Sequence, residues 1–154
     1  MAMPEAGAEA PQFELPDQSG AAVALRDLRG GWVVLYFYPR ADTPGCTTQA
    51  CSDRDRSTEY ADKGARVLGV SPDEVDAIAK FDTKYGLGFP LLSDPDHAVA
   101  EAYDVWGEKK NYGKTYMGII RSSFLVDEKG KVDHAWYKIS PKDTPTKLKQ
   151  ALEG

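Results

Sequence analysis

The segment Trp32–Tyr38 (Trp-Val-Val-Leu-Tyr-Phe-Tyr) constrains the fold of this chain more than any other part of the sequence. It is apolar at every position and rich in β-branched and aromatic side chains, the pattern of a strand that is covered on both faces. The run is far shorter than the ~20 apolar residues that a membrane-spanning helix requires. We therefore expect a central strand in a layered α/β fold, and no membrane span.

The rest of the chain alternates between strand and helix patterns. Segments 13–15 and 22–24 flank a turn cluster and predict a hairpin ahead of the central strand. Further strands are expected at 66–71, 89–92, 118–126 and 131–137, and helices at 44–63, 73–85, 96–103 and 145–153. Alternating strands and helices that end in a hairpin predict a mixed sheet with helices on both faces. This is the thioredoxin-like arrangement, parallel in its first half and antiparallel in its second.

Length and composition place these elements in one domain. The chain has 154 residues, within the usual range of about 100–200 for a domain, and a chain of this size folds without a disulfide or a metal. No linker or internal repeat divides residues 1–154. Residues 1–10 are rich in Ala, Glu, Pro and Gly, so we expect them to form a loose N-terminal arm.

The charge balance bears on partners and location. Nineteen Lys and Arg against 24 Asp and Glu give a net charge of −5. Such a chain offers no basic field to phosphates, which argues against a nucleic-acid partner. The N-terminus has no apolar signal-peptide core and carries Glu5 and Glu9 ahead of its first basic residue, Arg26. We therefore expect a cytoplasmic protein.

Cys46 follows the carboxyl end of the central strand, where open α/β sheets place their functional sites. Thr43 is the expected N-cap of the next helix, which puts Pro44 at N1 and Cys46 at N3. The thiol then lies beside backbone N–H groups and the positive end of the helix dipole, and both favour the thiolate. Gly45 leaves space for a small substrate. These features indicate a nucleophile.

Other interpretations of the two cysteines stay open on this evidence. Cys46 could be an inert buried thiol. Cys46 and Cys51 could join His97 and His134 in a zinc site, although Cys-x4-Cys is a wide spacing and the histidines are far apart in sequence. The cysteine pair could also switch a binding surface by oxidation, without turnover. Thioredoxin-type exchange is disfavoured, because the chain lacks Cys-x-x-Cys.

The segment around Cys46 resembles the active site of a known enzyme family. The pattern Pro39-x-x-x-Thr43-x-x-Cys46 matches the peroxiredoxin motif, and the longer run 36–51 is similar to the peroxiredoxin Q (bacterioferritin comigratory protein) branch. The similarity continues at 69–73, 89–94, 112–114 and 121–127. The resemblance implies reduction of hydrogen peroxide and organic hydroperoxides with no metal or organic cofactor. Electrons would come from thioredoxin or a glutaredoxin-like partner.

The resemblance also implies roles for five residues. By position, Cys46 would be the peroxidatic cysteine and Cys51 the resolving one. Thr43 would hydrogen-bond the peroxide and Pro39 would shield the pocket from water. Arg121 would stabilise first the thiolate and then the departing oxygen, since one guanidinium can serve both charges.

Arg121 is expected in the strand 118–126, on the face that it shares with Ile119 and Leu125. Both faces of that strand are apolar, so its guanidinium needs an anionic partner, and the Cys46 thiolate is the candidate. No exposed apolar stripe indicates a dimer, and we expect a monomer. The residues expected at the surface are His97, His134 and a basic, aromatic loop with Lys109, Lys110, Tyr112, Lys114 and Tyr116.

Helix geometry predicts a conformational change in such an enzyme. On a regular helix the Cα atoms of Cys46 and Cys51 lie roughly 8–9 Å apart, whereas a disulfide needs about 4.4–6.8 Å. The two sulfurs can therefore join only if the helix opens. We predict a continuous helix in the reduced protein and unwound first turns in the disulfide form.

Overall fold

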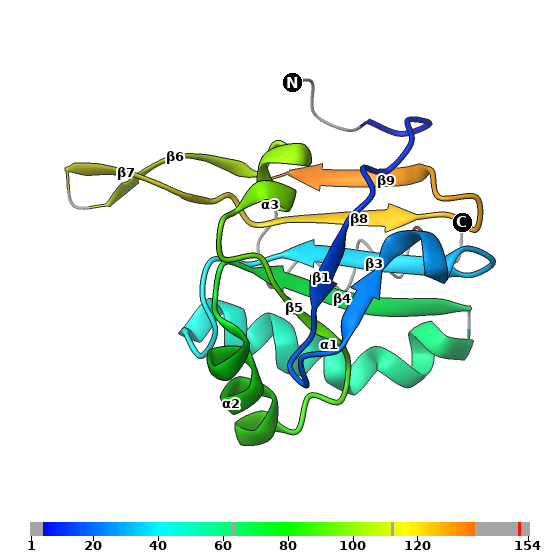
Figure 1. Cartoon of the computed structure of the whole chain (residues 1–154), viewed down its shortest axis with the longest axis horizontal. Coiled ribbons are helices and arrows are strands. Elements are labelled where there is room, and N and C mark those ends of the chain that lie inside the picture. The colour runs from blue at the N-terminus through cyan, green and yellow to red at the C-terminus, as the bar shows by residue number, and fades with distance from the viewer. Residues whose placement is uncertain (1–4, 63, 112, 138–150, 152–154) are drawn as a thin grey trace.

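The computed structural model describes residues 5–62, 64–111, 113–137 and 151, and it is built around a five-stranded sheet in the order β5-β4-β3-β8-β9 (Figure 1). The strands are β3 (Trp32–Phe37), β4 (Ala65–Ser71), β5 (Leu91–Ser93), β8 (Ser122–Val126) and β9 (Val132–Tyr137). β3, β4 and β5 run parallel, whereas β8 is antiparallel to β3 and β9 is antiparallel to β8. The predicted mixed sheet, with a parallel and an antiparallel half, is confirmed.

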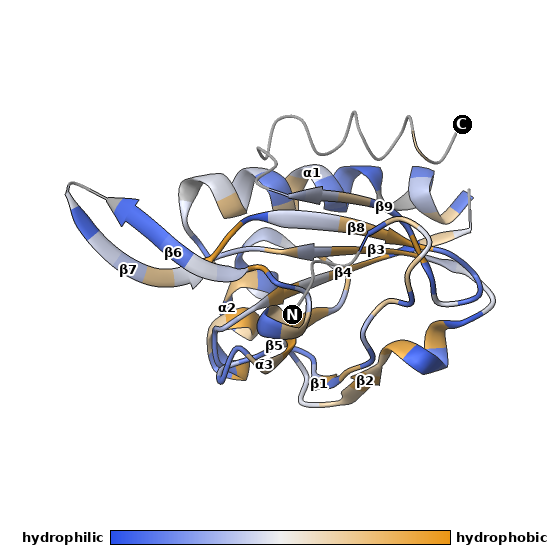
Figure 2. Cartoon of the chain, turned by 90° about the horizontal axis from the view of Figure 1, so that it is seen from above, coloured by the Kyte–Doolittle hydropathy of each residue, from blue (hydrophilic) through white to orange (hydrophobic). Residues whose placement is uncertain are grey.

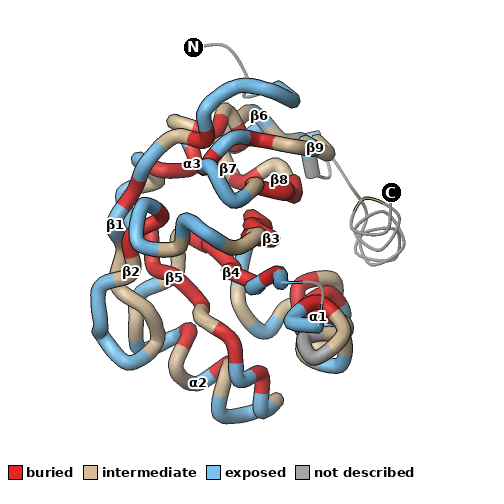
Figure 3. Tube along the Cα trace, turned by 90° about the vertical axis from the view of Figure 1, so that its right-hand side faces the viewer, coloured by how far each residue is buried: buried red, intermediate tan, exposed pale blue. Residues whose placement is uncertain are grey.

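Both faces of this sheet are covered. Helix α1 (Pro44–Asp62) lies against one face, and the opposite face carries the N-terminal hairpin and helix α3 (Ala98–Ala102) (Figure 3). The hairpin consists of β1 (Glu14–Pro16) and β2 (Ala22–Ala24), and a 3₁₀ turn, η1 (Leu25–Leu28), follows it. Helix α2 (Val75–Tyr85) packs into the same apolar cluster as α1. No helix in the described part of the chain has the length and hydropathy needed to cross a bilayer.

Strand β3 separates the two apolar clusters of the core, because successive side chains of a strand point to opposite faces. Leu35 and Phe37 belong to the cluster under α3, and Val34 and Tyr36 belong to the cluster under α1. These four side chains are at most 1% exposed, and burial of each contributes about 1.5–3 kcal/mol relative to exposure. Figure 2 shows the sheet between α1 on one side and the β1–β2 hairpin on the other.

The segment after α3 differs from the prediction. The residues expected as an exposed loop form a second hairpin, β6 (Trp106–Asn111) and β7 (Lys114–Ile119), which projects from the body (Figure 1). The predicted strand 118–126 is therefore two strands, β7 and β8, with Ile120 and Arg121 between them. Alternation does not carry across this break, and Ile119 packs in the cluster under α3 while Leu125 packs under α1. Placing Ile119 and Leu125 on one face was wrong.

The N-terminal arm is only partly loose. The Gly7 N–H donates to the Val132 carbonyl at 2.7 Å, and the Ala10 N–H donates to the Gly130 carbonyl at 3.0 Å. Ala10 is buried. The turn between β8 and β9 and the start of β9 present backbone carbonyls that need partners, and the arm supplies them. Residues 7–10 are therefore held against the body of the protein, and the prediction of a loose arm was wrong for them. The predicted closing helix 145–153 lies outside the described residues, apart from Ala151, which is helical.

Candidate active site

Helix α1 begins where the sequence predicted, and its first turn carries Cys46. Pro44 is its first residue, and the Thr43 carbonyl accepts the Thr47 N–H at 2.8 Å, as an N-cap carbonyl does. Cys46 is therefore at N3, with its side chain 1% exposed. Both cysteines are free and the helix is continuous through them. The predicted state of the reduced protein is thus observed.

Arg121 points its guanidinium at Cys46. Its Nη2 donates to the Cys46 sulfur at 3.0 Å, and its Nη1 donates to Oε1 of Gln49 in a short hydrogen bond. The break between β7 and β8 places Arg121 just before β8, next to the carboxyl end of β3. A planar guanidinium held at two points keeps a fixed orientation, and its positive charge stabilises a thiolate at this distance.

Gln49 is a member of this site that sequence reasoning missed. It is fully buried on α1, three residues after Cys46, so both side chains lie on the helix face toward the sheet. Its carbonyl oxygen holds Arg121. The three-residue spacing between Cys46 and Gln49 was the available signal, but nothing in the local sequence indicated that Arg121 would be the partner of Gln49.

The loop before α1 is tied down by polar contacts. Asp42 adopts a left-handed backbone conformation (φ +59°). Its carboxylate accepts hydrogen bonds from Lys84 Nζ at 2.8 Å and from the Tyr85 hydroxyl at 2.7 Å, and these two bonds lower the pKa of Asp42. The Ala41 N–H donates to Asp73 at 2.7 Å. These contacts attach the loop to α2 and to the turn that precedes α2. The hydrogen bonds of Asp42 are exposed to solvent, and exposed hydrogen bonds break more easily than apolar packing does.

The other predicted site residues lie close by in the chain. The Thr43 hydroxyl donates to the Arg40 carbonyl at 2.9 Å, which leaves its oxygen lone pairs available as acceptors. Pro39 is half-buried between β3 and this loop. Cys51 is half-buried on α1 and packs against the cluster under that helix. Among the five predicted site residues, Arg121 and Cys46 are joined by a side-chain hydrogen bond.

A buried carboxyl lies farther along α1. Asp53 is fully buried, and neither of its oxygens has a hydrogen-bond partner in the described structure. Burial raises the pKa of Asp53 to about 8, since an apolar environment disfavours the charged form. The carboxyl is therefore mostly protonated at neutral pH.

The histidines do not join the cysteines. The His97 ring is partly exposed and stacks on Trp106 with ring centroids 3.9 Å apart. His134 is exposed and stacks on Trp136. Among the residues that the structure describes, no three His, Cys, Asp or Glu side chains are grouped so that they could hold a metal ion.

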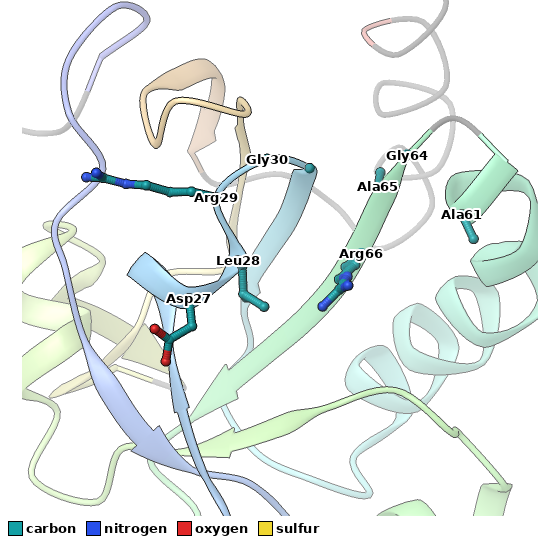
Figure 4. A pocket seen from close by; sticks show the side chains of 9 residues that line it. Asp27, Leu28, Arg29, Gly30, Ala61, Gly64, Ala65 and Arg66 are labelled. Atoms are coloured by element: carbon teal, nitrogen blue, oxygen red, sulfur yellow. The ribbon is translucent and has the colours of Figure 1, made fainter.

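A cavity of about 400 Å³ lies at the opposite end of the central strands. It is formed by the turn before β3 and the turn between α1 and β4, with Arg29 and Arg66 among its lining residues (Figure 4). In Figure 4 the Arg29 side chain points away from Arg66. None of the predicted site residues lines this cavity, so the site at Cys46 is separate from it.

Comparison with known proteins gives consistent matches along most of the chain. The sequence profile of the AhpC/TSA family matches residues 6–135. Peroxiredoxin Bcp of Bacillus subtilis is 47% identical over 149 residues, which cover 97% of this chain and 95% of that protein. Peroxiredoxin Bcp of Escherichia coli is 52% identical over 132 residues, covering 86% and 85%.

Solved structures agree with these matches. A mutant of Xanthomonas campestris peroxiredoxin Q superimposes with a TM-score of 0.90 at 39% identity, covering 97% of this chain and 98% of that one. A structure of the bacterioferritin comigratory protein of the same organism, described in terms of its alkyl peroxide reduction activity, gives a TM-score of 0.89 at 38% identity and covers 97% and 98%.

Proposed function

Since the chain belongs to the AhpC/TSA family of thiol peroxidases, in its peroxiredoxin Q (bacterioferritin comigratory protein) branch, we propose that it reduces peroxides with Cys46 as peroxidatic thiol and Cys51 as resolving thiol. Peroxiredoxins of this kind act on peroxides and are re-reduced by thiols. The roles proposed for Cys46 and Arg121 rest on their geometry, and those of Cys51, Thr43 and Pro39 rest on their positions in the family motif.

The observation that carries the assignment is the 3.0 Å contact between Arg121 and the Cys46 sulfur. A buried cysteine in an apolar setting stays a thiol and reacts slowly, whereas a sulfur at a helix N-terminus beside a guanidinium favours the thiolate. The thiolate is the nucleophile in thiol chemistry. This contact therefore favours a reactive role for Cys46 over the inert thiol that the sequence left open.

The proposed first step is a displacement on oxygen. The Cys46 thiolate attacks the terminal oxygen of the peroxide, an S–O bond forms and the O–O bond breaks. The sulfur is oxidised to sulfenic acid, and the departing alkoxide or hydroxide takes a proton from water to leave as alcohol or water. Arg121 stabilises negative charge first on sulfur and then on the departing oxygen. The Thr43 hydroxyl binds the peroxide, and Pro39 keeps water from the pocket.

The proposed second step forms the disulfide. The Cys51 thiolate attacks the sulfenic sulfur of Cys46, and the hydroxyl leaves as water after it is protonated. Because α1 holds the two cysteines apart, its first turns must unwind for this step. The exposed disulfide is then reduced by a dithiol donor, which we propose is thioredoxin or a glutaredoxin-like protein.

Several further features belong to the same proposal. We infer that residues 1–154 fold as one domain, that the enzyme acts as a monomer in the cytoplasm, and that it needs no metal or organic cofactor. Its net charge of −5 supports the absence of a nucleic-acid partner.

Replacement of Cys51 tests the proposed function and the order of its steps. In Cys51→Ser the first step is intact but resolution within the chain is lost, so the variant should consume about one equivalent of peroxide and then stop, unless an external thiol resolves the sulfenic acid. The measurement is peroxide consumption with a thioredoxin system, together with intact mass, which should show one added oxygen on Cys46. Ser52→Ala, a change at the adjacent position, is the matched control and should keep turning over. Wild-type turnover in Cys51→Ser would show that Cys51 is not the resolving residue.

A further inference from the structure

One charged side chain of the projecting hairpin, Lys109, is hydrogen-bonded to the segment that leads from β7 to Arg121. We propose that Lys109 is a second cation of the site, beside Arg121, and that it makes the enzyme favour hydroperoxides that carry a negative charge. This inference rests on the proposed peroxidase function, and it concerns which peroxides reach Cys46 fastest.

Lys109 is held in a defined position. Its Nζ donates a hydrogen bond to the Ile119 carbonyl at 2.8 Å, two residues before Arg121 in the chain. Its stem passes over Gly118, where an added Cβ would lie 3.2 Å from the Lys109 Cδ. A glycine at this position therefore leaves the room in which the stem lies. Unlike its exposed neighbours Glu108 and Lys110, Lys109 is half-buried.

The position of Lys109 brings it within electrostatic reach of the reacting sulfur. Burial and the positive charge of Arg121 lower the pKa of Lys109, and the negative charge of Cys46 acts in the opposite direction. Lys110 is the next residue of the same strand, so its side chain points to the other face of the hairpin. Lys109 and Lys110 thus form a natural pair for comparison, since one lies on the side of the site and the other does not.

The charges at the site do not cancel. The Cys46 thiolate and the Arg121 guanidinium balance one another, which leaves the Lys109 ammonium in excess. The Asp42 carboxylate is turned to α2, where Lys84 and Tyr85 hold it. The Asp73 carboxylate is engaged by Ala41 and Ser71. A peroxide with a carboxylate is therefore attracted to the site, whereas neutral hydrogen peroxide gains nothing from the excess charge.

Two peroxides with the same reacting group separate charge from reactivity. We would measure the second-order rate constant for Cys46 oxidation with cumene hydroperoxide and with its para-carboxylate derivative. The informative quantity is the ratio of the two rate constants, carboxylate over neutral, because a purely structural effect changes both constants alike. The proteins are the wild type, Lys109→Gln, Lys109→Arg and Lys110→Gln.

The expected ratio falls by about three- to tenfold in Lys109→Gln, as for the loss of one charge near the binding site. Lys109→Arg should keep the wild-type ratio, and Lys110→Gln, which removes the same charge one residue away, should also keep it. The effect should shrink from about 0.01 M to about 1 M salt, where screening shortens from ~30 to ~3 Å.

Equal ratios in the wild type and Lys109→Gln would overturn the inference and leave the peroxidase function in place. An equal loss in Lys109→Gln and Lys110→Gln would also overturn it, because general surface charge would then explain the preference. If the wild type reduced neither peroxide, the proposed function itself would fail, and this inference with it.

Discussion

Replacement of Cys46 by serine is expected to abolish peroxide reduction. A serine hydroxyl cannot supply the thiolate that acts as the nucleophile in thiol chemistry, and oxygen is a poor nucleophile toward a peroxide O–O bond. The near-isosteric change leaves the first turn of α1 and its buried position intact, so the loss is chemical rather than structural. Peroxide consumption with a thioredoxin system should be no faster than in a protein-free blank.

Thermal unfolding of the same sample should show a folded protein with a melting temperature close to that of the wild type, which excludes misfolding as the cause. In a single-turnover experiment, Cys51→Ser should still react with peroxide, whereas Cys46→Ser should not. If Cys46→Ser still consumed peroxide at the wild-type rate, Cys46 would not be the nucleophile.

Loss of the Arg121 guanidinium is the second large effect. Arg121→Ala removes the donor at the Cys46 sulfur and should slow oxidation of Cys46 by about 10²–10³-fold, the usual cost of deleting one donor that stabilises developing negative charge. The pH dependence of the reaction should also shift to higher pH, because the thiolate loses its positive neighbour. Both effects are measured in one stopped-flow series across pH.

Two further variants sharpen this result. Arg121→Lys should recover only part of the rate, because an ammonium cannot hold Gln49 and the sulfur together in one plane. Arg66→Ala removes an exposed arginine beside the distant cavity and should react as the wild type does. An unchanged rate and pH profile in Arg121→Ala would reduce Arg121 to a structural residue.

The parts of this fold that sequence reasoning predicted are those with strong local signals. The apolar run of β3, Thr43 and Pro44 at the helix start, and the glycines that follow α1 and α2 each specify structure within a few residues. Cys46 was placed at the N3 position of α1 for the same reason. These local signals were sufficient for the nucleophile and for the layered sheet.

The remaining features depend on contacts between distant segments. The β6–β7 hairpin is rich in Lys and Gly, residues with low strand propensity, and its two strands pair with each other outside the main sheet. The break between β7 and β8 also interrupts the alternation of side chains, so Ile119 and Leu125 lie on opposite faces of the central sheet. The contacts of Gln49 with Arg121, and of Asp42 with α2, join residues far apart in sequence, so they depend on the tertiary fold.

The proposed mechanism requires α1 to open so that Cys46 and Cys51 can join. Amide hydrogen exchange followed by mass spectrometry measures this opening on the peptide that covers residues 44–56, in the reduced protein and after one equivalent of peroxide. The peptide mass should report the Cys46–Cys51 disulfide, and exchange in its first turns should rise sharply in the oxidised form while β3 stays protected. Equal protection of residues 44–56 in both forms, with the disulfide confirmed by mass, would show that the disulfide forms without opening of α1.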